Sequence, residues 1–259
     1  MSMNFIKNFL LKLLGEKNYL FFLASMYQLL YKTKTLSKDH DDVYFLKKII
    51  YPGNYVADIG AHLGYFTFEL SRLVGAGGNV FAIEPVSKFY SVIKKMIHRK
   101  KKSNIHLHKV ALGGNSEFVE MGIPWVGKQK KFGYARIKEM SEYFNYAETE
   151  MVPNVKGDDL FVDLPRLDFI KCDVEGAEVL VFRSMLQVVK KHTPILLCEL
   201  ADKLERIKMY EMLLPFGYKL YLLNKEKLSQ LDAYSELAVT LNHYFIPESR
   251  AEKIKHLID

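Results

Sequence analysis

Acidic side chains stand where three apolar, strand-like runs of the sequence end. Asp58 lies near the end of the first run, Glu84 directly follows the second, and Asp173 directly follows the fourth. The first acid opens the segment Asp58-Ile59-Gly60-Ala61-His62-Leu63-Gly64, in which two glycines precede a helical pattern. In open α/β sheets, ligands bind at the carboxyl ends of the strands, so we expect these acids to surround a ligand.

The glycine segment predicts a tight turn at which the backbone approaches a ligand closely. Its spacing misses the Gly-x-Gly-x-x-Gly pattern of nicotinamide cofactors. S-adenosylmethionine carries an ammonium group, a carboxylate and a sulfonium but no phosphate, so Asp58 is expected to hold its positive end; structural capping is the alternative. We expect Glu84 to accept the ribose hydroxyls. His62 either donates to the cofactor carboxylate or is a packing or capping residue.

An acidic, glycine-containing turn, Asp173-Val174-Glu175-Gly176-Ala177-Glu178, follows the fourth run. Asp173 and Glu175 in this turn, with Glu199 after the fifth run, are the candidate general bases, and Asp173 is ranked first. The same three carboxylates could instead hold Mg²⁺ or Mn²⁺, which prefer oxygen ligands. A third interpretation is that Glu175 or Glu178 caps the next helix.

Four segments together resemble the FkbM family of S-adenosylmethionine-dependent methyltransferases: 58–64, Glu84-Pro85, Lys109-Val110-Ala111-Leu112-Gly113 and 173–178. The resemblance extends over residues 51–247. It implies a class I methyltransferase (Rossmann-like) α/β fold, with a doubly wound seven-stranded sheet in the order 3-2-1-4-5-7-6. It also implies S-adenosylmethionine as cofactor, with the expected contacts Asp58, Gly60, Ala61, His62, Gly64, Glu84, Pro85, Ala111 and Asp173.

Apolar runs alternate with helical patterns along most of the chain, which is typical of parallel βαβ units. The runs are Tyr55–Ile59, Val80–Ile83, Ile105–Val110, Leu167–Cys172, Pro194–Leu200, Tyr218–Leu223 and His243–Ile246. No long helix separates the last two, so we expect them to form an antiparallel pair at one edge of the sheet.

The sequence is interpreted as an N-terminal helical extension, residues 1–38, followed by a methyltransferase domain, residues 39–259. A basic amphipathic helix is predicted over 5–14 and an apolar helix over 19–31. We expect both to cover their own domain; peripheral membrane contact through residues 5–31 is the alternative. A further helix is predicted to begin at Ser37 and to end before Pro52-Gly53.

The segment 113–166 is longer than one crossover needs and is assigned to substrate binding. Its aromatic and basic residues are Trp125, Lys128, Lys130, Lys131, Phe132, Tyr134 and Arg136.

The formal net charge of +7 is concentrated at the N-terminus, because residues 1–38 hold six lysines and one glutamate. The remaining domain is nearly neutral, which argues against a broad nucleic-acid surface. Residues 94–109 nevertheless hold seven Lys/Arg and no acid, which indicates a solvated helix end or a contact with nucleic acid.

The two cysteines, Cys172 and Cys198, lie in apolar runs and are expected to be buried thiols, not a disulfide or a zinc site. No run is long enough for a transmembrane helix, and no cleaved signal is expected. A cytoplasmic location is expected, with peripheral membrane contact as the alternative.

The resemblance implies transfer of a methyl group to a hydroxyl of a sugar, a glycan or a glycosylated natural product. A sugar or glycan acceptor is therefore the expected partner. An RNA methyltransferase is the second hypothesis, because residues 94–109 and 125–136 are basic and partly aromatic. A cofactor-binding scaffold without turnover is the third.

Overall fold

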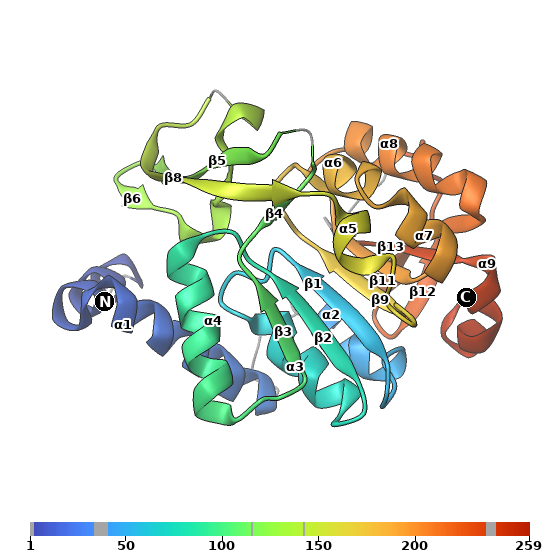
Figure 1. Cartoon of the computed structure of the whole chain (residues 1–259), viewed down its shortest axis with the longest axis horizontal. Helices are drawn as coiled ribbons and strands as arrows, with labels where there is room; N and C mark the ends of the chain where they lie inside the picture. The colour runs from blue at the N-terminus through green and yellow to red at the C-terminus, as the bar shows by residue number, and fades with distance from the viewer. Residues whose placement is uncertain (1–2, 34–40, 115, 142, 237–241) are drawn as a thin grey trace.

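The computed structural model describes residues 3–33, 41–114, 116–141, 143–236 and 242–259 (Figure 1). An eight-stranded sheet with the order β12-β11-β13-β10-β9-β1-β2-β3 forms its centre. The strands are β1 (Tyr55–Ile59), β2 (Asn79–Ile83), β3 (Ile105–His108), β9 (Phe169–Cys172), β10 (Ile195–Glu199), β11 (Tyr218–Asn224), β12 (Lys227–Gln230) and β13 (Asn242–Pro247).

Strand directions confirm the expected topology. Strands β3, β2, β1, β9 and β10 are parallel neighbours, and β13 runs antiparallel between β10 and β11. This is the order 3-2-1-4-5-7-6, including the antiparallel pair expected from the last two apolar runs. An eighth strand, β12, pairs with the outer side of β11 and takes the edge position. It was not predicted, because its residues are mostly polar and a tight turn through Lys225, at φ 58°, joins it directly to β11.

Helices cover both faces of the sheet, as the fold class requires. They are α1 (Met3–Lys32), α2 (Asp41–Phe45), α3 (Tyr65–Val74), α4 (Ser87–Lys100), α5 (Gly157–Phe161), α6 (Glu178–Arg183), α7 (Leu186–His192), α8 (Lys203–Leu213) and α9 (Glu248–Ala251). Short 3-10 helices are η2 (Leu46–Lys48), η3 (Phe132–Tyr134), η4 (Lys138–Met140), η5 (Leu214–Phe216) and η6 (Glu252–Leu257). One core lies under α1, α3 and α4, and a second lies under α5 to α8.

Strand residues alternate between these two cores because successive side chains point to opposite faces of a sheet. Val56 belongs to the core under α1, α3 and α4, and its neighbour Ala57 belongs to the core under α5 to α8. The cysteines Cys172 and Cys198 are buried free thiols, as expected.

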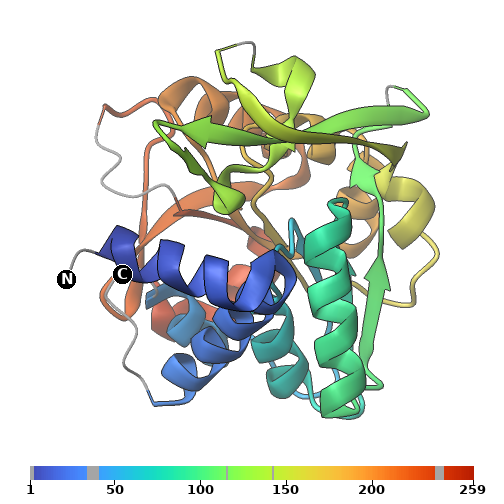
Figure 2. The ribbon, with the colours of Figure 1, turned by 90° about the vertical axis from the view of Figure 1, so that its left-hand side faces the viewer.

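Helix α1 consists of two helical halves joined at Gly15, where φ 71° and ψ 159° break the helix. This matches the two helices predicted over 5–14 and 19–31. The second half packs on the domain: Tyr19, Leu20 and Ala24 are buried in the core, and α1 lies against α3 and α4 (Figure 2). The expectation that the extension covers its own domain is therefore confirmed for this half.

The helix predicted from Ser37 is observed as α2 continued by η2, and both precede Pro52. The predicted start at Ser37 and the boundary between residues 38 and 39 lie outside the described residues. Within the described parts of the chain, no helix is both long and apolar enough to span a membrane.

The segment 113–166 carries most of a second, smaller sheet, which Figure 1 shows as a separate layer above the large one. Its strands are β4 (Ala111–Leu112), β5 (Phe118–Val126), β6 (Gln129–Lys130), β7 (Arg136–Ile137) and β8 (Tyr146–Val155). Strands β5 and β8 form its long antiparallel pair. Sequence analysis predicted no strand here; β8 is polar with only two buried residues, whereas β5 is apolar with five buried residues and was missed.

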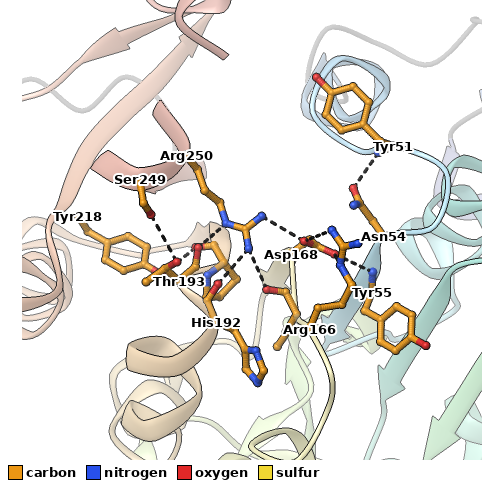
Figure 3. Close-up of polar contacts among 12 residues, drawn as sticks. Tyr51, Asn54, Tyr55, Arg166, Asp168, His192, Thr193, Tyr218, Ser249 and Arg250 are labelled. Carbon is orange, nitrogen blue, oxygen red and sulfur yellow. Dashed lines mark hydrogen bonds and ion pairs between the residues drawn. The ribbon is translucent and has the colours of Figure 1, made fainter. Parts of the chain in front are cut away.

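A charged network holds the amino ends of the strands, on the side opposite the glycine segment (Figure 3). The Tyr55 backbone N–H donates to Asp168 at 3.0 Å, and the same carboxylate pairs with Arg166 at 2.7 Å and with Arg250 at 3.2 Å. Burial raises the pKa of Asp168, but the bonds from Arg166, Tyr55 and Arg250 outweigh it and lower the pKa overall. Arg250 thereby fixes α9 to the strands, so the site at the other edge rests on a rigid frame.

Candidate cofactor and active site

A cavity of about 430 Å³ lies at the carboxyl ends of β1, β2 and β9, where the sequence places the acids. Eight of the nine expected cofactor contacts line it: Asp58, Gly60, Ala61, His62, Glu84, Pro85, Ala111 and Asp173. Gly64 is not one of the lining residues and begins α3 instead, with φ 80°. A Cβ atom at Gly64 would lie 2.8 Å from the Phe68 ring, so this position requires glycine for packing.

The glycine segment lies directly on the acidic turn. Gly60 has φ 80°, and a Cβ atom there would lie 1.9 Å from the backbone oxygen of Asp173. The N–H groups of Gly60 and Ala61 both donate to the Ile83 carbonyl at 3.0 Å. The two segments that sequence analysis singled out therefore form one wall of the cavity, and only glycine permits their close approach.

Glu84 is 3% exposed and points into its own loop. One carboxylate oxygen accepts the backbone N–H of His62 and the other accepts that of Val86, both at 2.7 Å. Burial nevertheless raises the pKa of Glu84 to about 8. Each carboxylate oxygen can accept a second hydrogen bond, so Glu84 can still receive hydroxyl donors from a ligand in the cavity.

Asp58 is 1% exposed and accepts the Thr67 hydroxyl at 2.5 Å. Thr67 lies in the first turn of α3, so Asp58 both lines the cavity and holds the helix that follows. Burial raises the pKa of Asp58, against the opposing effect of the Lys171 ammonium. The capping interpretation and the ligand interpretation are thus compatible for this residue.

The His62 ring is enclosed, with its centroid 4.3 Å from that of Phe89 and 5.8 Å from that of Tyr65. Burial lowers the pKa of His62 to about 4, so the ring is neutral at physiological pH. Its Nε2 atom is buried and has no hydrogen-bond partner in the described structure. A buried unpaired nitrogen is unfavourable, so a polar group of a ligand would stabilise it.

Lys171 is the functional residue that sequence reasoning missed. It lies in β9, is 3% exposed, and pairs with Asp173 at 2.5 Å. Burial lowers the pKa of Lys171, but attraction to Asp173 and Asp58 outweighs it, and the pKa is raised overall. A lysine inside a fully buried strand needs charged partners. The position of Lys171 within the apolar run Leu167–Cys172 could therefore have identified it from the sequence.

The three candidate bases all line the cavity but have different partners. Burial raises the pKa of Glu199, and repulsion from Asp173 and a hydrogen bond with Asp173 raise it further. Glu175 pairs with Arg136 of the small sheet at 2.8 Å. Burial and repulsion from Asp173 raise the pKa of Glu175 to about 7.

The described structure shows no side-chain hydrogen bond that caps α6, so it does not support the capping interpretation for Glu175 or Glu178. Glu178 accepts the backbone N–H groups of Val174 at 2.9 Å and Gly176 at 3.1 Å, which closes the acidic turn at the start of α6.

The alternative of a metal site at Asp173, Glu175 and Glu199 has no support in the described residues. Among the described residues, no three His, Cys, Asp or Glu side chains group closely enough to hold one metal ion. Asp173 and Glu175 are instead neutralised by Lys171 and Arg136.

The small sheet and the short helix η3 supply another part of the cavity wall. Met121 of β5, Phe132 of η3 and Ile137 of β7 line it, and Phe132 packs edge-on against Phe89. The segment 113–166 therefore encloses the ligand cavity, while its assignment to the acceptor stays a prediction.

The strand order and a cavity at the carboxyl ends of β1, β2 and β9 define the class I methyltransferase fold. A family model described as methyltransferase FkbM domain matches residues 58–226. The chain belongs to the FkbM methyltransferase family and is an S-adenosylmethionine-dependent methyltransferase. The unpaired His62 Nε2 and the buried carboxylates of Asp58 and Glu84 fit a cofactor that carries hydroxyl, ammonium and carboxylate groups.

Solved structures with a similar fold are distant in sequence. A SAM-dependent O-methyltransferase from Thermotoga maritima is 13% identical with a TM-score of 0.46 over 81% of this chain, which spans 64% of that enzyme's length. A putative rRNA methylase from Clostridium thermocellum is 13% identical with a TM-score of 0.47, over 79% of this chain and 90% of that one. A tRNA (m1A58) methyltransferase from Aquifex aeolicus is 15% identical with a TM-score of 0.43, over 81% of this chain and 68% of that one. No curated protein sequence matches the chain.

Proposed function

We propose that this methyltransferase acts on a hydroxyl oxygen of a sugar or glycan. The observation that supports this most directly is the cluster of Lys171, Asp173 and Glu199 in the wall of the cofactor cavity. A sugar hydroxyl must lose its proton when the oxygen is methylated, and positioned carboxylates can receive it.

The cofactor would be held by the residues that line the cavity at the carboxyl ends of β1 and β2. Asp58 faces its positive end, Glu84 accepts its ribose hydroxyls, and His62 offers the unpaired Nε2 to a polar group. When bound, S-adenosylmethionine supplies an electrophilic methyl group on a sulfonium centre.

Asp173 acts as the general base in this proposal. Lys171 bonds to Oδ2 of Asp173 at 2.5 Å, which fixes the carboxylate beside the cavity. Lys171 is thus a positioning residue. Glu199 hydrogen-bonds Asp173, and burial, repulsion from Asp173 and this bond raise the pKa of Glu199.

The test uses purified protein with isotopically labelled S-adenosylmethionine and a panel of nucleotide sugars, hexose and deoxyhexose glycosides and short RNAs. We expect label at a sugar hydroxyl, located by mass spectrometry and NMR. Methylation of RNA bases without any sugar product would replace the proposal with the RNA alternative, for which the basic residues 94–109 are the available sequence feature.

A further inference from the structure

The half of α1 that precedes its kink is apolar on two sides. Leu10, Leu11 and Leu14 pack against the core of the domain. Phe9 and Leu13, which lie one turn apart on the same face of the helix, are 57% and 67% exposed. A surface helix that only covers its own domain has charged or polar residues on its outer face. The exposed face of this half therefore suits an apolar partner outside the chain.

The hairpin between β5 and β6 adds two exposed apolar side chains next to this helix. Trp125 is 41% exposed and Val126 is 39% exposed. The ammonium group of Lys7 in α1 donates to the carbonyl oxygen of Lys130 in β6 at 3.3 Å, and Figure 2 shows α1 below the small sheet at the front of the molecule. Grouped apolar side chains mark an interaction site, whereas scattered ones do not. We call this surface the α1 face; its exposed apolar residues are Phe9, Leu13, Trp125 and Val126.

A hollow of about 310 Å³ lies between α1 and the hairpin. Three lysines line it, Lys7, Lys128 and Lys130, and Glu16 is the one acid among its described lining residues. Glu16 pairs with Lys130 at 3.2 Å inside a cluster of two carboxylates and two ammonium groups, whose charges cancel. Lys7 and Lys128 form no ion pair with any described residue. The hollow therefore keeps two positive charges after its ion pairs are counted.

The surroundings of Lys7 disfavour its charge. Burial lowers the pKa of Lys7, and repulsion from Lys131 lowers it further. The ammonium group contacts the Lys130 carbonyl oxygen and lies 5.8 Å from the centroid of Phe132, and both of these partners are uncharged. An anion in the hollow would favour the charged form of Lys7 and offset the repulsion. This points to an anionic ligand independently of the exposed apolar side chains.

We infer that the α1 face binds the surface of an anionic lipid bilayer. A headgroup phosphate enters the hollow beside Lys7 and Lys128. Phe9, Leu13 and Trp125 enter the boundary between the headgroups and the acyl chains, where tryptophan and the apolar faces of lysine-bearing helices are commonly found. A bilayer supplies an anionic group and an apolar layer together, so one partner satisfies both parts of the α1 face.

Phe132 places this membrane contact next to the cofactor. Its ring lines both the hollow and the cofactor cavity. The bilayer therefore lies beside the wall of the cofactor cavity. Membrane binding does not depend on the identity of the acceptor, so it can be measured without turnover.

Binding is measured by sedimentation of the full chain with vesicles of phosphatidylcholine alone or of equal parts phosphatidylcholine and phosphatidylglycerol. We expect stronger binding to the anionic vesicles. Binding should decrease as the concentration of NaCl is raised, because salt screens the attraction between lysines and phosphates. Equal binding to both kinds of vesicle, or binding to neither, would overturn the inference.

Trp125 is the single tryptophan of the chain and therefore reports its own surroundings. Its fluorescence emission should shift to shorter wavelength when anionic vesicles are added, and lipids brominated on the acyl chain close to the headgroup should quench it. An emission spectrum that stays unchanged with vesicles that sediment the protein would show that another surface binds them, which would contradict the inference.

A double variant, Lys7→Gln with Lys128→Gln, tests the hollow. It should weaken binding to the anionic vesicles about 25-fold, from about 5-fold for each lysine lost near the membrane surface. The matched control, Lys190→Gln with Lys208→Gln, removes the same charge from α7 and α8, which lie on the far side of the molecule from α1 (Figure 1). The control should leave binding nearly unchanged. An equal loss in both double variants would mean that net charge alone attracts the vesicles, and the inference would fail.

The variant Leu13→Ser tests the apolar part of the α1 face. It should weaken vesicle binding about 10-fold, because the leucine side chain no longer enters the apolar layer. Leu204→Ser is the matched control, because Leu204 is 59% exposed on α8. The affinity of each variant for S-adenosylhomocysteine shows whether its fold is intact. A folded Leu13→Ser protein that binds vesicles as tightly as the native chain would refute the insertion of α1.

Glycerol 3-phosphate and a short RNA test two other anions that the lysines of the hollow could bind. We expect neither to displace the protein from anionic vesicles at an equal concentration of phosphate groups. Binding of either ligand that is lost in the Lys7 and Lys128 double variant, without sedimentation by vesicles, would assign the hollow to that ligand and overturn the inference.

Discussion

Glu84 should make cofactor binding depend on pH. Burial raises its pKa from 4.5 to about 8 in the cofactor-free protein, so the carboxyl group is mostly protonated at pH 7. Ribose hydroxyls that donate to Glu84 would favour the ionised form. We therefore expect S-adenosylmethionine to bind more tightly as pH rises from 6 to 8, and each binding event at pH 7 to release close to one proton.

The raised pKa of Glu84 also makes the free energy of unfolding depend on pH, and the size of that effect follows from the shift. One pKa unit corresponds to about 1.4 kcal/mol, so a rise from 4.5 to about 8 is worth about 5 kcal/mol. The native state binds more protons than the unfolded chain in this range, so this contribution to the free energy of unfolding is present below pH 4.5 and is lost as pH rises through 8. Glu84→Gln should abolish this pH dependence.

Calorimetry in two buffers of different ionisation enthalpy measures the proton release directly. The native protein should release the proton at pH 7, and Glu84→Gln should release none. Glu84→Ala should in addition weaken cofactor affinity by about 1–3 kcal/mol, because the ribose hydroxyls lose their proposed acceptor. If the native protein and the Glu84→Gln variant released the same number of protons on binding, or if cofactor affinity did not depend on pH, the reasoning would be refuted.

Three further predictions concern the carboxylates beside Lys171. Asp173→Asn should keep cofactor affinity in calorimetry but lower kcat about 10²–10⁴-fold; an unchanged kcat would exclude it as the base. Lys171→Met should lower the free energy of unfolding by about 1–3 kcal/mol in urea at pH 7, because it removes a buried partner of Asp173, whose side chain is 30% exposed and partly screened by water. The raised pKa of Lys171 keeps this stabilisation present at neutral pH and removes it only at alkaline pH, so a loss confined to high pH would contradict the pairing. A chelator should leave kcat unchanged, since Asp173 and Glu175 are bonded to Lys171 and Arg136; activity restored by added Mg²⁺ would disprove this.

Local patterns in the sequence were sufficient to predict the large sheet. Its central parallel strands, β1, β9 and β10, are apolar runs because both of their faces are buried. The glycine segment was recognisable because Gly60 needs a positive φ and close contact with Asp173, which few other residues allow. Local segments therefore predicted the strands and the glycine turn, whereas the strand order and the full set of cofactor contacts came from the family resemblance.

The small sheet and the cavity between α1, α2 and α3 could not be predicted in this way. Strand β8 is polar because one side faces solvent, so it lacks the apolar run that marks a buried strand. Gln28, Arg72 and Lys102 line this cavity from distant parts of the chain, and the packing of α1 on both α3 and α4 brings them together. The spacing of these residues in the sequence does not indicate that packing.

The N-terminal extension is joined to the small sheet by ion pairs as well as by packing. Glu16 of α1 and Glu148 of β8 each pair with both Lys88 of α4 and Lys130 of β6. The Lys88 ammonium also lies 5.5 Å from the centroid of Phe132, which lines the cofactor cavity. Residues 1–38 contain six lysines and one acid, and this acid, Glu16, binds α1 to the small sheet through Lys130. Because α1 also contributes Tyr27 to the wall of the cofactor cavity, the extension helps to form that cavity.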